Sequence, residues 1–133
     1  MKNDVCVMFG MDDAPDNLTE KILKTAERYY LEHGVRFFIF GYTGNFDKCA
    51  LKAFNMLKEK YPDVGGNMQM IFEPPIEEFP REFPILEVQN EFIREAKTFI
   101  CYVKRPYNTR TLLRITQGIH DYDQRIITNL GRR

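Results

Sequence analysis

The sequence predicts an α/β domain in which a mostly parallel sheet of about five strands lies between layers of helices. Short apolar runs alternate along the chain with segments whose apolar residues recur at helical spacing. The runs show no alternation of polar and apolar residues, which is typical of strands that are covered on both faces. Strands that alternate with helices form parallel sheets, because each helix returns the chain to the edge where the next strand begins.

Length and composition fit one soluble domain that spans residues 1–133. Hydrophobic residues make up 44% of the 133, which is enough for a packed core. Basic and acidic residues are equal at 19 each, and this balance argues against a general nucleic-acid binder. No apolar run is long enough for a signal peptide or a membrane span. We therefore expect a cytoplasmic protein without a membrane partner.

The first half of the chain predicts three strands, at 5–9, 35–40 and 68–72. A helix follows the first strand. Asn17 and Glu20 fit a capping box at its start, Asp16 could cap it instead, and Gly34 ends it. The helix after the second strand has Asn45 as its expected N-cap, and the glycine pair within 61–67 belongs to the turn that ends it. One face of this second helix is apolar, with Phe46, Cys49, Ala50, Ala53, Phe54, Leu57 and Tyr61.

The second half begins with a proline-rich segment, 73–84, which we expect to be a surface loop. A helix at 85–96, a strand at 98–103, a helix at 109–118 and a strand at 125–130 should follow. Right-handed crossovers then give a three-layer, doubly wound, Rossmann-like sheet with helices on both faces. In such sheets ligands bind beyond the carboxyl ends of the strands, here the segments 9–13, 41–47, 73–75 and 104–109.

The segment 41–47, Gly-Tyr-Thr-Gly-Asn-Phe-Asp, has two interpretations. Gly41 and Gly44 would let backbone N–H groups approach an anion at a helix N-terminus. The Asp47 carboxylate would oppose a phosphate and suits a ribose hydroxyl or an amine better. The segment matches neither a Walker loop nor Gly-x-Gly-x-x-Gly. The alternative is a plain strand-to-helix turn without a ligand.

Charged residues near the other strand ends are equally open to two interpretations. Asp12, Asp13 and Asp16 could hold Mg²⁺ or simply form a turn. Arg110 and Arg114 share a helix face and could meet phosphate or solvent. A phospho-receiver domain would need an acceptor aspartate at the end of the third strand, where this chain has Glu73.

The sequence contains no convincing metal site and no supported nucleophile. Cys6, Cys49 and Cys101 are far apart, and no Cys-x-x-Cys or Cys/His cluster occurs. We expect them to be reduced cysteines of the core. No metal is predicted, and no catalytic residue or cofactor can be named.

The order of motifs resembles the SLOG superfamily, Rossmann-like domains that include LOG phosphoribohydrolases and the DNA-processing protein A. The closest likeness is to small YpsA-like members, whose second strand ends in Gly-Gly-x-x-Gly-x-Asp before an alanine-containing helix with a Lys-Tyr-Pro end. The residues that match this pattern are Gly41, Gly44, Phe46, Asp47, Ala50 and 60–62. Further along the chain, Pro74, Asn90, Ala96 and Tyr102 match the family's later strands and helix.

Several positions depart from that family. Tyr42 replaces the second glycine, Gln89 replaces an arginine, and Gly10-Met11-Asp12 stands where the family tends to have Gly-His-Arg. The Pro-Gly-Gly-x-Gly-Thr-x-x-Glu run of LOG enzymes is absent. The resemblance implies a ligand site, with an altered contact set, formed by Gly10, Gly41, Tyr42, Thr43, Gly44, Asp47, Glu73, Pro74, Asn90 and Arg110.

Three functional hypotheses follow. The first is a domain that binds a nucleotide-like small molecule, and it predicts that Gly41→Val abolishes binding while the domain stays folded. The second is a degenerate module for homo-oligomer or other protein contacts, through the 73–84 segment or a helix face. The third is a LOG-like hydrolase of nucleoside monophosphates, with Glu73 and Asp47 as acid/base candidates and Arg110 or Arg114 on the phosphate.

Overall fold

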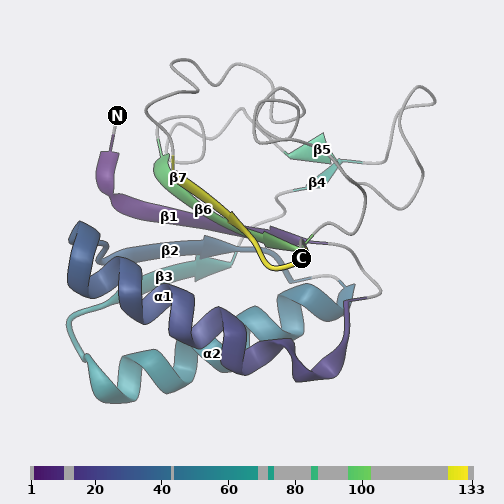
Figure 1. Cartoon of the computed structure of the whole chain (residues 1–133), viewed down its shortest axis with the longest axis horizontal. Coiled ribbons are helices and arrows are strands. Elements are labelled where there is room, and N and C mark those ends of the chain that lie inside the picture. The colour runs from purple at the N-terminus through teal and green to yellow at the C-terminus, as the bar shows by residue number, and fades with distance from the viewer. Residues whose placement is uncertain are drawn as a thin grey trace.

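Five parallel strands form the sheet that the apolar runs predict. The computed structural model describes residues 2–10, 14–42, 44–68, 72–73, 85–86, 96–102 and 126–131. The sheet has the order β3-β2-β1-β6-β7, with all neighbours parallel (Figure 1). Its strands are β1 (Lys2–Gly10), β2 (Phe37–Phe40), β3 (Gly65–Met68), β6 (Ala96–Tyr102) and β7 (Ile126–Asn129). This confirms the predicted α/β class and its Rossmann-like order.

Two helices, α1 (Thr19–His33) and α2 (Gly44–Lys60), cover the same face of the sheet (Figure 1). Both connect strands that step in the same direction, from β1 to β2 and from β2 to β3, so right-handed crossovers place them together. The expected helix at 109–118 lies outside the described residues. The expected helix at 85–96 is wrong at both ends, because Ile85–Leu86 is strand β5 and Ala96 already belongs to β6.

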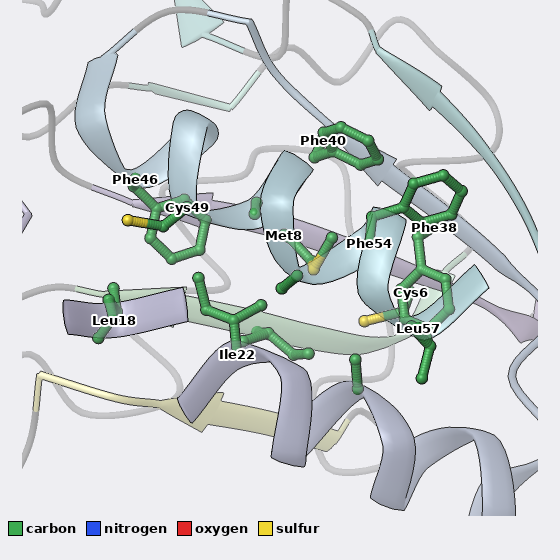
Figure 2. Packing of buried hydrophobic residues seen from close by; sticks show 14 of the residues in the cluster. Cys6, Met8, Leu18, Ile22, Phe38, Phe40, Phe46, Cys49, Phe54 and Leu57 are labelled. Atoms are coloured by element: carbon green, nitrogen blue, oxygen red, sulfur yellow. The ribbon is translucent and has the colours of Figure 1, made fainter. Parts of the chain in front are cut away.

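Both faces of the central strands are buried, which explains why these strands lack alternation. Cys6 and Met8 of β1 belong to the core under the helices, whereas Val7 and Phe9 on the opposite face are also buried. Figure 2 shows part of the core beneath α1 and α2, including Met8, Leu18, Ile22, Phe38, Phe46, Phe54 and Leu57. The predicted apolar face of α2 is therefore confirmed as a core face.

The start of α1 differs from the expected capping box. A short 3-10 turn, η1 (Asp16–Leu18), precedes α1, and neither start has a side-chain cap hydrogen bond. Asp16 instead accepts a hydrogen bond from Asn45 of α2. The predicted end is correct, because Gly34 adopts φ 70° in the left-handed region and its N–H donates to the Tyr29 carbonyl.

The third strand begins earlier than predicted. Gly65 and Gly66 form β3 with Asn67 and Met68, rather than a turn that ends α2. A Cβ on Gly66 would lie 2.6 Å from the Phe54 ring, so glycine here lets the helix pack closely on the strand. Residues 69–71 of the predicted strand lie outside the described residues.

The second half of the chain contributes two short strands and the remaining two strands of the five-stranded sheet, β6 and β7. Phe72–Glu73 (β4) and Ile85–Leu86 (β5) form a two-stranded antiparallel ladder at the two ends of the proline-rich segment. β6 starts two residues before its predicted start, and β7 agrees with the predicted strand within a residue at each end. Among the described helices, none is long and apolar enough to cross a membrane.

At the amino edge of the sheet, a polar and aromatic cluster joins α1 to the chain around β2. The Tyr30 hydroxyl donates to Asp63 Oδ1 at 2.7 Å, and Arg36 Nε lies 3.1 Å from Asp63 Oδ2. The Arg36 guanidinium lies 3.9 Å from the centre of the Tyr30 ring. This cluster lies at the edge opposite to the one where ligands bind in this fold.

Candidate functional site

The strand order places the topological switch point between β1 and β6. From β1 the chain moves through β2 to β3 on one side, whereas β6 and β7 lie on the other. The two strands end together, because Gly10 is the register partner of Tyr102. A sheet of this kind binds its ligand in the crevice beyond such a pair of carboxyl ends. The corner after β2 is adjacent, since β2 pairs with β1.

The structure describes about half of the predicted ligand residues. Gly10, Gly41, Tyr42, Gly44 and Asp47 are described, and all five lie at or just beyond the ends of β1 and β2. Only the backbone of Glu73 is described, and it pairs with Ile85 in the small sheet. Thr43, Pro74, Asn90 and Arg110 lie outside the described residues, as do Asp12, Asp13 and Arg114. The acid/base roles suggested for Glu73 and Asp47 stay a prediction.

The space beside Gly41 is filled by the chain's own carboxylate. A Cβ on Gly41 would lie 2.5 Å from Asp47 Oδ2 and 3.0 Å from Asp47 Cγ. Asp47 comes from the first turn of α2 and is 2% exposed. Its carboxyl group also lies at the end of the helix that favours anions. The glycine therefore admits Asp47, which explains the spacing of this pair without a phosphate.

Gly10, at the end of β1, has the same relationship to Phe46. A Cβ on Gly10 would lie 2.5 Å from two atoms of the Phe46 ring, which is fully buried. The close approach that glycine permits at this strand end is thus made by an aromatic side chain of α2. On the helix-covered face, neither Gly10 nor Gly41 leaves an open backbone surface for a ligand.

At the start of α2, the glycine at position 44 agrees with the predicted turn, whereas the role of Asn45 differs from the predicted one. Gly44 has φ 82°, so glycine is required here by backbone conformation. Asn45 is not an N-cap as predicted, since it lies inside α2. Its side-chain amide donates instead to the carbonyl of Ala14 and, at 2.8 Å, to Asp16 Oδ1. These partners are about thirty residues away in sequence, so no local pattern could have indicated them.

A second residue of α2 reinforces this contact. The Cys49 thiol lies 3.6 Å from the Pro15 carbonyl and 3.7 Å from the Asp16 carbonyl. Cys49 belongs to the core, as its place on the apolar face of α2 predicts, because the residue is 3% exposed. The first two turns of α2 thus hold the segment 14–16 that leads from β1 to α1.

The described part of the carboxyl edge offers an exposed aromatic ring and a buried acid. Tyr42 is 52% exposed directly after the buried Gly41, so its ring is open to a partner. Asp47 is the one buried acidic side chain among the described residues. The corner after β2 can therefore offer an exposed aromatic ring at Tyr42 next to Gly41, which lies against the buried Asp47 carboxyl group.

The thiols of the described core do not provide nucleophiles. Burial raises the pKa of Cys6 to about 12 and also raises the pKa of Cys101 well above its ordinary value. Both thiols therefore stay protonated at neutral pH. All three cysteines are free and buried, as predicted. Within the described ranges, no three His, Cys, Asp or Glu side chains gather in a way that could hold a metal ion.

The fold and its carboxyl edge define a Rossmann-like parallel α/β domain. Comparison with known proteins found no matching family model, no matching curated protein and no matching solved structure.

Proposed function

We propose that this protein binds a nucleotide-like small molecule at the carboxyl edge of its sheet, as a SLOG/YpsA-type domain with an altered contact set. The observation that carries the proposal is the reversal of strand order between β1 and β6, whose ends meet at Gly10 and Tyr102. Open parallel sheets bind nucleotides in the crevice at such a reversal. The resemblance of Gly41, Gly44 and Asp47 to the YpsA-like turn agrees with this location.

The described side chains favour one orientation of such a ligand. A phosphate directly over Gly41 would meet the Asp47 carboxylate, which lies against that glycine. The exposed Tyr42 ring, by contrast, suits a base or another flat group, because every base has a face that stacks on an aromatic side chain. We therefore propose that the base and ribose lie over the corner after β2, with the phosphate farther away, where Arg110 remains a candidate partner.

Calorimetric titration with adenosine, AMP, ADP-ribose and NAD tests the proposal. ADP-ribose is the main probe because it combines a base, two riboses and a diphosphate. Tyr42→Ala should weaken ADP-ribose binding by about 1–3 kcal/mol, the usual contribution of one stacked base. Leu31→Ala is the matched control, because it removes a 63% exposed apolar side chain from α1. Absence of heat with all four probes would exclude the proposed function.

A second candidate function, protein–protein contact, is favoured by two large apolar side chains that are exposed at the end of β3 and just beyond the end of β2. Met68, the register partner of Phe40, is 43% exposed, and Tyr42 lies two residues beyond Phe40. Large exposed apolar side chains are a feature of many interaction sites. We propose a homo-oligomer as the form this function would take. Sedimentation equilibrium of the wild type and of Met68→Glu tests it, and a wild type that stays monomeric at all concentrations would exclude it.

A further inference from the structure

Three consecutive residues of α2 hold three separate parts of the carboxyl edge. Asn45 donates hydrogen bonds to Ala14 and Asp16, Phe46 packs on Gly10, and Asp47 lies against Gly41. Successive side chains of an α-helix point about 100° apart, so one turn reaches three neighbours in different directions. The first turn of α2 therefore joins the end of β1, the corner after β2 and the approach to α1.

Among these three contacts, that of Asn45 is polar and directional. Its amide has two donor hydrogens, and the two acceptors found are the carbonyl of Ala14 and the carboxylate of Asp16. Ala14 is 3% exposed, so its carbonyl has little access to water as a substitute donor. Phe46 fixes Gly10, the last residue of β1, and Asn45 fixes the chain again at Ala14, four residues later.

We propose that Asn45 is a positioning residue for ligand binding at this edge, an inference that rests on the function proposed above. Its side chain fixes the segment 14–16 on α2. This segment leads from the end of β1 into α1, so Asn45 sets where the chain lies beside the switch point. Without it, this segment would have to become ordered when a ligand binds, and the entropy lost would weaken the affinity. Asn45 acts through the segment that it holds and need not touch the ligand.

The first test is Asn45→Ala, with ADP-ribose as the probe. We expect the Kd for ADP-ribose to rise about tenfold, because binding must then supply the cost of ordering the segment 14–16. Without ADP-ribose, hydrogen exchange of the backbone amides of residues 16–18 should become faster. Tyr30→Phe is the matched control, because it removes one side-chain hydrogen bond at the opposite edge of the sheet. Its Kd for ADP-ribose should equal that of the wild type.

Exchanging the amide at position 45 and the carboxylate at position 16 separates the effect of this contact from general destabilisation. In Asn45→Asp, two carboxylates face each other at positions 45 and 16, so binding should weaken more than in Asn45→Ala. In the double variant Asn45→Asp/Asp16→Asn, the new amide at position 16 can donate to the new carboxylate at position 45. Affinity for ADP-ribose should then recover in part, because the Ala14 carbonyl still lacks its donor.

The outcomes separate this inference from the function on which it rests. If the wild type binds ADP-ribose and Asn45→Ala binds it equally well, the positioning role is wrong and the proposed function stands. An equal loss in Tyr30→Phe would also overturn the role, since the effect would then follow overall stability. If the wild type binds none of the four probes (adenosine, AMP, ADP-ribose and NAD), the proposed function fails and the role of Asn45 fails with it.

Discussion

The Asp47 carboxylate occupies the space that a side chain at Gly41 would need. The distance from Asp47 Oδ2 to a Cβ built on Gly41 is 2.5 Å, and both residues are buried. The corner between β2 and α2 is thus closed by the chain itself. A substitution at Gly41 therefore disturbs the packing of Asp47 even when no ligand is bound, so its effect on stability must be measured before its effect on binding.

Gly41→Ala should destabilise the domain, whether or not a ligand is present. The new methyl group must displace Asp47, and overpacking of this kind costs about 1–3 kcal/mol. Gly41→Val should cost more, so the expectation that it leaves the fold intact is not supported by the structure. Urea denaturation measures the effect. The double variant Gly41→Ala/Asp47→Ala should lose less free energy of unfolding than the sum of the losses in the two single variants. Strict additivity of the losses would contradict the contact.

Gly10→Ala should be more harmful than Gly65→Ala, although both glycines lie in strands. A Cβ on Gly10 would lie 2.5 Å from the Phe46 ring, whereas one on Gly65 would lie 3.1 Å from the Phe37 ring. Small shifts of Phe37 can absorb the second contact, so we expect a difference of about 1–2 kcal/mol in the free energy of unfolding. Equal losses in the two variants would show that Phe46 does not pack on Gly10 in this way.

Tyr29→Phe should loosen the attachment of α1 to β6 and β7. The Tyr29 hydroxyl is hydrogen-bonded to Thr128 and donates to the Phe99 carbonyl at 3.3 Å. Removal of a buried hydrogen bond that leaves a partner unsatisfied costs about 1–3 kcal/mol. A double-mutant cycle with Thr128→Val measures the coupling. The coupling energy should be well above zero, and a value within error of zero would mean that the two hydroxyls do not interact in solution.

Stability should fall as the pH rises from about 9 to about 12. Burial raises the pKa of Cys6 from 9.0 to about 12 and that of Tyr29 from 10.0 to about 12. Between these values the unfolded chain loses protons that the folded chain keeps, so ionisation favours unfolding. The contribution of each group is complete below its unfolded pKa and decreases above it, by at most about 1.4 kcal/mol per pH unit.

Urea denaturation at a series of alkaline pH values measures this slope. Cys6→Ala and Tyr29→Phe should each make the slope shallower, because each removes one group that ionises in the unfolded chain. Tyr30→Phe should also make the slope shallower, because the hydrogen bond that the Tyr30 hydroxyl donates to Asp63 raises the pKa of Tyr30. A slope that none of the core variants changes would contradict the assignment to Cys6 and Tyr29.

Much of the fold could be predicted because its signals are local. The apolar runs at β1, β2 and β7 and the apolar face of α2 depend on residues that are close in sequence. The start of β3 was missed, because a glycine pair is normally a turn signal. Here Gly66 is glycine because the Phe54 ring of α2 lies against it, which is a contact between distant residues.

The candidate site also has features with local signals and features that depend on contacts between distant residues. Gly41, Gly44 and Asp47 could be identified from their spacing after an apolar strand, and Gly44 does have the left-handed backbone that favours glycine. The spacing could not predict which side chain occupies the space beside each glycine. Nor could the hydrogen bonds from Asn45 to Ala14 and Asp16, because they depend on how α2 packs beside the chain that leads into α1.

By itself, the sequence determined the α/β class and the order of the five parallel strands and two helices of the described domain. The class and the order follow from hydrophobic periodicity and from the fixed hand of β-α-β crossovers. The ligand site at the carboxyl edge stays a prediction. The tertiary structure alone decided that Phe46 and Asp47 occupy the spaces beside Gly10 and Gly41, and that Asn45 holds the segment 14–16. The reason is physical: a close approach between distant side chains is fixed by packing in three dimensions, which no local pattern of residues specifies.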